Sequence, residues 1–288
     1  MDIKKKIPDR FLSIIEEIPA IPDVVVKVMQ LTRNPDVTAK ELTDMISNDP
    51  GLTGNILRLC NSAYYGIPRV VSSLNQAVMY LGFHTIRNLV LTCSINSFFN
   101  PKQPVYGYVN GGIWHHSVAC AITSELICNH VRPELHDSAF TAGLLHDIGQ
   151  LILGISIKDT SESIVDMMIN GGVDELNAEI NSLGFTHEEL GAHLANAWNF
   201  PDELIHAICH HHNPLDSKTQ TEMTSIIHIA DAMALELGFG IELEQMKFPV
   251  NPAALEMFGL NQEWLATMRE EAVTLIDEKA TQFMEILN

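Results

Sequence analysis

Apolar residues recur every three or four positions along most of this chain, which is the spacing of one face of an α-helix. The pattern predicts helices at about residues 22–34, 38–47, 49–60, 73–82, 84–98, 113–130, 138–153, 161–169, 186–199, 202–212, 223–237 and 262–287. No convincing run of alternating apolar and polar residues, the pattern of a β-strand, is found. We therefore predict an all-α protein.

Residues that favour helix ends mark several of these segments. Capping boxes, in which a hydroxyl and an acid or amide three residues later exchange backbone hydrogen bonds, are predicted at Thr38/Glu41, Ser73/Gln76 and Thr186/Glu189. Asp49 and Pro50 predict an N-cap followed by a proline in the first turn. Gly82 is expected to end the helix that precedes it.

Residues 100–112 contain prolines, glycines and two tyrosines and lack a helical period. Such a stretch is typical of a connection between domains. We expect a boundary there, with an N-terminal helical bundle over residues 1–104 and a second helical domain, including a C-terminal helix, over residues 105–288.

Composition indicates a folded protein and narrows its partners. Of 288 residues, 46% are hydrophobic and 18% are charged, the balance of a globular protein. The formal net charge of −19 argues against binding to nucleic acid or to an anionic membrane. The turn at Gly82 resembles a helix-turn-helix, but such turns are common in any helical bundle. We therefore expect neither nucleic acid nor a membrane as a partner.

Cysteine usage and the N-terminal sequence favour a reducing compartment. The five cysteines are odd in number and form no C-x-x-C pair, so neither a disulfide framework nor a cysteine zinc site is predicted. The charged N-terminus is followed by no apolar segment of a signal peptide. No apolar run approaches the roughly 20 residues that span a bilayer. A cytoplasmic protein is the expectation.

His146 and Asp147 stand side by side inside an otherwise apolar run, Phe140 to Ile157. Desolvating an ionised carboxylate is costly unless it is hydrogen-bonded, paired or bound to a metal. The nearest basic residues, Arg132 and Lys158, lie outside the run. The doublet is either a buried hydrogen-bonded pair or half of a metal site whose other ligands come from elsewhere in the chain.

Further histidines and one aspartate fall on inward helical faces or at helix ends. They are His116, His187, His210, His211, His212 and Asp231. Each has a simpler interpretation, because a lone histidine is more often a satisfied core residue and a C-terminal triplet complements the helix dipole. Together they can converge on one point of a helical bundle. Imidazole and carboxylate suit one or two divalent ions such as iron, manganese, nickel or zinc, and metal-activated water can attack a phosphoester.

The order His116, His146-Asp147, His187, His211-His212, Asp231 resembles the HD superfamily of metal-dependent phosphohydrolases. The closest resemblance is to the HDOD domain, an HD-related output domain of bacterial signalling proteins. The stretches that carry it are Ile18–Pro22, Asp49–Leu52, Leu59–Ala63, Ala77–Gly82, His116-Ser117 and His228–Asp231. The resemblance implies an N-terminal helical bundle followed by an HD-superfamily-like helical domain.

The HD-GYP relatives, which cleave cyclic dinucleotides, imply a two-metal ligand set for this chain. Its members are His116, His146, Asp147, His187, His211, His212 and Asp231, with Asp147 as the bridge between the ions and the catalytic residue if the site is active. The triplet leaves the register open by one residue, so that His210 is an alternative to His212.

Two departures from active relatives weigh against turnover. Gln150 stands where many have a lysine after the doublet, and Asn213-Pro214-Leu215 replaces the Gly-Tyr-Pro loop. A neutral amide cannot offset charge on a phosphoryl transition state as lysine does. Our leading hypothesis is a bacterial signalling module with a metal centre that acts through protein partners. The alternative is an active phosphohydrolase or phosphodiesterase on a nucleotide or cyclic dinucleotide. The sequence does not assign an oligomeric state.

Overall fold

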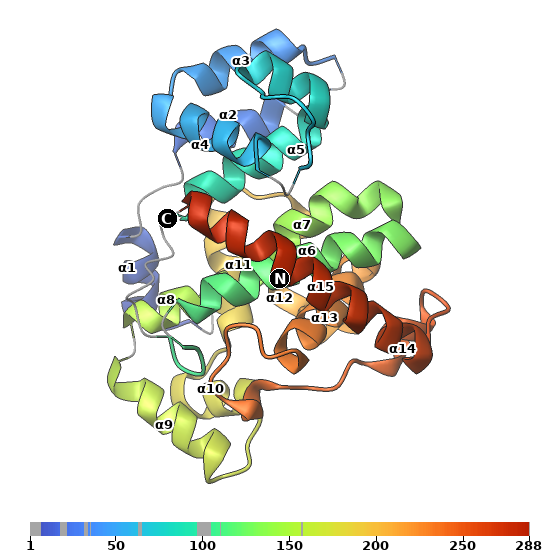
Figure 1. The fold of residues 1–288 in the computed structure, drawn as a ribbon. Helices are drawn as coiled ribbons and strands as arrows, with labels where there is room; N and C mark the ends of the chain where they lie inside the picture. Colours follow the sequence, from blue (N-terminus) through green and yellow to red (C-terminus); the bar gives the residue numbers. More distant parts are fainter. Residues whose placement is uncertain are drawn as a thin grey trace. The chain divides into compact units, whose positions relative to one another are not determined.

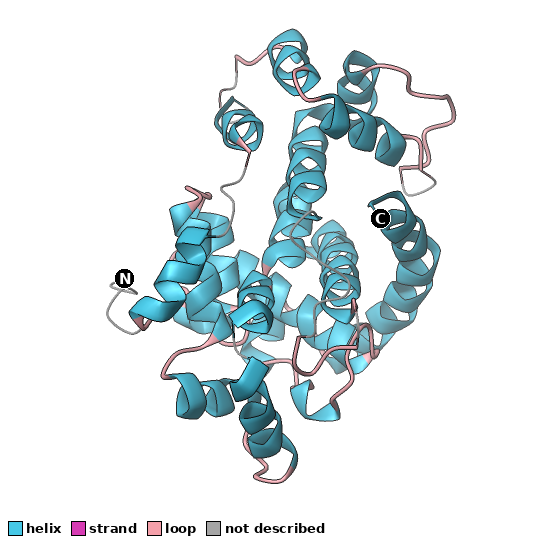
Figure 2. Ribbon diagram, turned by 90° about the vertical axis from the view of Figure 1, so that its left-hand side faces the viewer, coloured by secondary structure: helices cyan, strands magenta, loops and turns pink. Residues whose placement is uncertain are grey.

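The structure is a computed structural model that describes residues 7–17, 22–31, 34, 36–62, 65–96, 105–109, 111–156 and 158–287. Within these ranges the chain is helical, with one isolated β-bridge between Tyr108 and Ile241 and no strand (Figure 2). The predicted all-α class is confirmed. Parts of two stretches that carry the family resemblance lie outside the described residues, namely residues 18–21 of Ile18–Pro22 and Ala63 of Leu59–Ala63.

The chain divides into two compact units. Unit 1 comprises Met1–Pro19 and Phe99–Ala272, and unit 2 comprises Ala20–Phe98 and Val273–Asn288. The first residues of the chain therefore belong to the same unit as its C-terminal half, and the last residues belong to the unit formed by Ala20–Phe98. The predicted boundary between residues 104 and 105 stays a prediction.

Unit 2 is a small helical bundle. Its helices are α2 (Asp23–Leu31), α3 (Ala39–Ser47), α4 (Pro50–Cys60), α5 (Leu74–Asn96) and the later part of α15 (Gln262–Leu287) (Figure 1). Helix α5 packs against α2, α3 and α4. Gly82 has φ 79° inside α5, so the helix is kinked where a stop was predicted.

Unit 1 carries the remaining helices. They are α1 (Asp9–Glu17), α6 (Gly112–Val131), α7 (His136–Leu145), α8 (Ile148–Ser156), α9 (Lys158–Ile169), α10 (Glu175–Leu183), α11 (His187–Ala197), α12 (Asp202–His210), α13 (Thr221–Glu236), α14 (Pro252–Glu256) and the start of α15, with 3₁₀ turns η2 (Pro133–Leu135), η3 (Pro214–Asp216) and η4 (Glu244–Met246). Helix α6 packs along α7 and α13, and α11 packs against α8 and α12 (Figure 1). No helix among the described residues is both long enough and apolar enough to cross a membrane.

Helix caps predicted from sequence are largely present. The boxes at Thr38/Glu41 and Thr186/Glu189 are complete, and the Asp49 side chain accepts from the backbone of Leu52. At the start of α5 the pattern differs, because the Gln76 side chain accepts from the Ser72 backbone while Ser73 accepts from the Gln76 backbone.

The prediction of one continuous helix over residues 138–153 was wrong. The structure has two helices there, α7 and α8, separated by a turn at His146 and Asp147. Both helices are buried next to the turn, so the residues on either side of it are apolar. The spacing of apolar residues therefore does not change where the helix ends. The turn directs the histidine and the aspartate into the interior of unit 1.

Candidate metal centre

The His146-Asp147 turn is held at the centre of unit 1. His146 has no solvent exposure and Asp147 is only 4% exposed. His146 Nδ1 donates to the Gly143 carbonyl oxygen at 2.7 Å, a bond within the last turn of α7. This bond fixes the ring and turns Nε2 toward the neighbouring histidine and aspartates.

One group of ligand atoms lies between α6, α7 and α13. His116 Nε2 is 3.1 Å from Asp231 Oδ1 and 3.2 Å from His146 Nε2. All three side chains are buried. Both oxygens of Asp231 are shielded from solvent, and no donor among the described residues meets them with hydrogen-bond geometry. The negative charge of this buried carboxylate must be balanced by a proton on a neighbouring imidazole or by a bound cation.

A second group lies between the start of α11 and the end of α12. His187 Nε2 is 3.2 Å from the Nε2 atoms of both His211 and His212. His211 Nδ1 donates to the Ile208 carbonyl oxygen, and His187 Nδ1 faces the carboxylate of Glu179 at 2.9 Å. Each Nδ1 therefore has an acceptor of its own, and Nε2 of both rings faces the cluster. Two ring nitrogens 3.2 Å apart need a proton or a cation between them.

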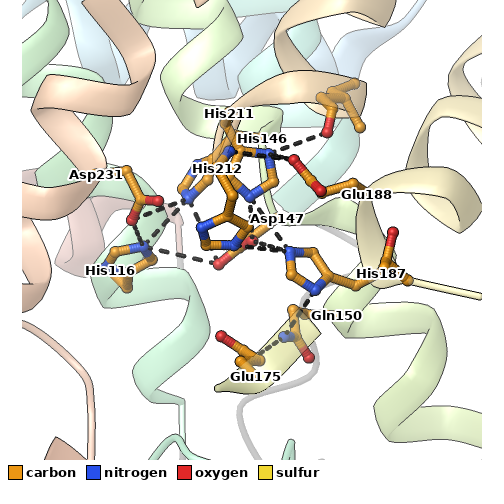
Figure 3. Close-up of polar contacts among 12 residues, drawn as sticks. His116, His146, Asp147, Gln150, Glu175, His187, Glu188, His211, His212 and Asp231 are labelled. Atoms are coloured by element: carbon orange, nitrogen blue, oxygen red, sulfur yellow. Dashed lines mark hydrogen bonds and ion pairs between the residues drawn. The ribbon is translucent and has the colours of Figure 1, made fainter. Parts of the chain in front are cut away.

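Asp147 lies between the two groups, as Figure 3 shows. Its Oδ2 is 3.4 Å from His146 Nε2 and 3.7 Å from His116 Nε2. Its Oδ1 is 3.4 Å from His211 Nε2 and 3.6 Å from His187 Nε2. One carboxylate thus presents one oxygen to each group, which is the position of a ligand shared by two ions.

The charge balance also fits a metal. Five buried carboxylates surround the imidazoles, and no lysine or arginine is found among the buried residues that the structure describes; the acids are Asp147, Glu175, Glu179, Glu188 and Asp231. Burial raises the pKa of Glu175 to about 8. Burial opposes ionisation of Asp147 as well, but the neighbouring His146 holds its pKa well below the usual range. The positive charge of this interior must come from protons on histidine or from bound metal.

A shell of supporting groups, which the sequence did not reveal, orients these side chains. Tyr108 Oη donates to Asp147 Oδ2 at 2.6 Å. Tyr106 Oη donates to Glu179, whose carboxylate in turn accepts from His187 Nδ1. Carboxylates and hydroxyls behind metal-binding histidines fix the ring orientation and raise ligand basicity. Both tyrosines belong to the segment that we took for a domain connection, and their presence in a glycine-rich stretch was the one available signal.

His228 joins the centre to a more distant loop. It lies one helical turn before Asp231 on α13, and its Nδ1 donates to the His211 carbonyl oxygen at 2.7 Å. Its Nε2 accepts from the backbone N–H of Asn251 at 2.9 Å. Both ring nitrogens are therefore used, and His228 holds the chain at His211 rather than offering a ligand atom.

The structure brings together all seven residues predicted to bind metal. These residues fall into groups of three, and the ligand atoms within each group lie within 4.8 Å of one another. In the triplet, His211 and His212 enter the cluster, whereas the His210 ring lies 5.7 Å from the ring of His206. Gln150 lies behind the cluster, where its Nε2 donates to Glu175 Oε1 at 2.5 Å.

The all-helical fold agrees with the resemblance to HD-type proteins that the order of histidines and aspartates implied. The sequence matches the HDOD domain over residues 18–214, and the chain belongs to this family. The HD-type fold and the His/Asp groups together suggest metal binding.

Solved structures share this fold. An HDOD domain protein of unknown function from Geobacter sulfurreducens has 24% sequence identity and a TM-score of 0.69, with 99% of this chain and 97% of that chain covered. A candidate phosphohydrolase from Shewanella amazonensis SB2B has 25% identity and a TM-score of 0.69, with 96% and 97% covered.

Among curated relatives, the cyclic-di-AMP phosphodiesterase PgpH of Bacillus subtilis is 24% identical over 190 residues. The alignment covers 62% of this chain and 24% of that protein. The first curated relative is likewise much longer than the aligned region, which covers 38% of it. The aligned region thus spans well under half the length of each of these two relatives.

Proposed function

We propose that this HDOD protein is a bacterial signalling module whose HD-type half binds two divalent transition-metal ions. The observation that carries the proposal is the position of Asp147, with one oxygen facing each histidine group. His116, His146 and Asp231 would hold one ion, and His187, His211 and His212 the other. Five imidazoles with two carboxylates suit iron, manganese, nickel or zinc rather than calcium or magnesium.

The signalling part of the proposal concerns protein partners. A module of this kind acts by exposing a partner surface to a degree that depends on what its centre binds. Such coupling requires that the ligand bind two conformations with different affinities. HDOD membership supports this role, and the buried, densely hydrogen-bonded centre supports a site whose occupancy affects the packing around it.

Metal content measured on protein purified without chelators tests the centre. We expect about two equivalents in the parent, the number set by a bridging carboxylate with three further ligands on each side. Asp147→Asn, which keeps the shape of the side chain, should lose most of this metal. Asp216→Ala, on an exposed 3₁₀ turn, is the matched control and should keep it. A parent without metal after anaerobic reconstitution refutes the centre.

Phosphoester hydrolysis is a second candidate, favoured by a cavity that opens at His212. Bound metal would polarise the phosphoryl oxygen and supply an activated water. Asp147 and the histidines would position it, and the Tyr108 hydroxyl would hold the Asp147 carboxylate. Gln150 contributes no positive charge, because its side-chain amide is neutral; this amide donates to Glu175.

An assay of phosphate or nucleotide release tests this second candidate, with manganese, iron or nickel added. The substrates include cyclic dinucleotides and nucleoside monophosphates. Turnover that disappears in Asp147→Asn would support an enzyme. If metal-loaded protein turns over none of these substrates, the hydrolase candidate is refuted and the signalling role remains.

A further inference from the structure

Two histidines of α12 belong to neither group of the buried centre. His206 and His210 are four residues apart, so their side chains lie on one face of the helix, one turn from each other (α12 is labelled in Figure 1). Both are partly exposed, unlike His187 and His211. His210, the alternative ligand to His212 in the sequence, is instead a neighbour of His206. This pair is therefore open to ions from solvent.

The spacing and the distance of the two rings suit a shared ion. Two histidines at this spacing on one helix are a recurrent pair of zinc ligands. The ring centroids of the pair are 5.7 Å apart, and the ring planes are inclined by 39°. In the buried centre the centroid distance is 5.1 Å for His116 and His146, and 5.3 Å for His187 and His211. A small side-chain rotation at these partly exposed positions closes the difference.

His206 is held from behind by a buried hydroxyl. Its Nδ1 is 3.0 Å from Ser217 Oγ, and Ser217 has no solvent exposure. A partner at one ring nitrogen fixes a metal-binding histidine and directs its other nitrogen to the ion. The other nitrogen, Nε2, has only a long contact of 3.5 Å with Thr219 Oγ1, which a metal ion can replace. Neither ring nitrogen of His210 has a hydrogen-bond partner among the described residues. Both rings therefore have a nitrogen available for an ion.

We propose that His206 and His210 form a second metal site, which binds one divalent ion such as copper, nickel or zinc on the partly exposed face of α12. Imidazole pairs favour these ions over magnesium and calcium, which prefer oxygen ligands. Only two protein ligands and water coordinate the ion, so it exchanges with solvent. Desalting removes it, and it is not one of the two equivalents expected in purified protein.

The site acts on the last turn of α12. An ion that bridges His206 and His210 links two successive turns, and the chain continues from His210 directly into His211 and His212 of the second histidine group. His211 Nδ1 bonds to the Ile208 carbonyl oxygen of the same turn at 3.0 Å. Because the ion binds the ordered helix and not the unfolded chain, it stabilises the folded protein to a degree that grows with its concentration.

Nickel titrated calorimetrically into desalted full-length protein tests the site, with the metal content of the buried centre measured on each sample. We expect one equivalent of nickel beyond the ions already bound, and a urea midpoint that rises with added nickel. His210→Ala and His206→Gln should each weaken this binding about tenfold or more, since loss of even a supporting group behind a ligand costs about 10–100-fold. The rise in the urea midpoint should disappear in both variants.

His84→Ala is the matched control. His84 is an exposed histidine on α5, and no second histidine lies three or four residues from it. This variant should bind nickel as tightly as the parent does and show the same rise in the urea midpoint.

Asp147→Asn separates this site from the buried centre. The variant should lose the buried ions but still take up the equivalent of nickel that His210→Ala removes. A parent that binds no nickel beyond its buried ions overturns the present proposal alone, and so does a His210→Ala variant that binds nickel as the parent does. Nickel binding without a rise in the urea midpoint overturns the link across α12. A parent without buried metal that still binds nickel through these two histidines refutes the centre and supports this site.

Discussion

Gly149, the second residue of α8, offers the sharpest test of how the centre is packed. A Cβ at this position would lie 1.9 Å from the His187 carbonyl oxygen, 2.8 Å from its carbon and 2.9 Å from the Gly191 nitrogen. These are backbone atoms, so no side chain can rotate away. Glycine is required here because α8 and α11 approach each other at the first residue of α11, which is His187.

Gly149→Ala should therefore separate the two helices. Ordinary contact begins at 3.4 Å, so α11 must withdraw by roughly 1.5 Å at His187. Overpacking of this kind costs about 1–3 kcal/mol in the free energy of unfolding. The same shift moves His187 Nε2 away from His211 Nε2, now 3.2 Å distant. We expect the variant to lose the metal of the second histidine group and to retain that of the first.

The assay combines urea unfolding with metal analysis. Gly54→Ala is the control, because Gly54 is exposed on α4 and a Cβ there meets no atom within 4 Å. Alanine at an exposed helical position should stabilise the protein by about 0.5–1 kcal/mol. If Gly149→Ala unfolds at the same urea concentration as the parent and keeps two metal equivalents, the close approach of α8 and α11 is wrong.

Three further predictions concern the groups around the centre. Buried Glu175 has a pKa of about 8, above its ordinary value of 4.5. Between pH 4.5 and 8 the folded state of chelator-treated protein therefore holds a proton that the unfolded state releases, and the free energy of unfolding falls as the pH rises. Glu175→Gln should make that fall in the urea midpoint shallower; an unchanged slope would contradict this. Tyr108→Phe removes the donor to Asp147 and should weaken metal binding by about 10–100-fold in competition with a chelator, with the far-ultraviolet circular dichroism preserved. His228→Ala leaves the buried His211 carbonyl and the half-buried Asn251 N–H without their partner and should cost about 1–3 kcal/mol in urea unfolding, whereas no change would show that water replaces the ring.

The sequence predicted the fold class well because its helices carry their own signals. The capping boxes at Thr38 and Thr186 are local, formed by residues three apart, and were found in the structure. The kink at Gly82 is local as well. The division of α7 from α8 was missed, because the turn at His146 is buried and its neighbours are as apolar as those of a continuous helix.

The candidate site was predictable only in its first layer. The order of histidines and aspartates along the chain resembles that of a known family, and this resemblance identified the seven residues that the structure brings together. The groups that support them follow no short-range rule: Tyr108 and Asp147 are 39 residues apart, and Tyr106 and Glu179 are 73 apart. Their pairing depends on how α10 and the segment before α6 are placed by tertiary packing, which no local pattern encodes.

The buried acids explain why the properties of this centre should depend on its metal. Gln150 Nε2 donates to Glu175 and lies 3.4 Å from His187 Nδ1, so a neutral side chain occupies the place of a possible buried cation. A lysine there would balance one carboxylate permanently. With glutamine, the balancing charge is left to ions or protons that come from solvent, and anything that binds only the folded state stabilises it by mass action. If the centre binds metal as proposed, its occupancy and the stability of unit 1 would be linked through the same five carboxylates.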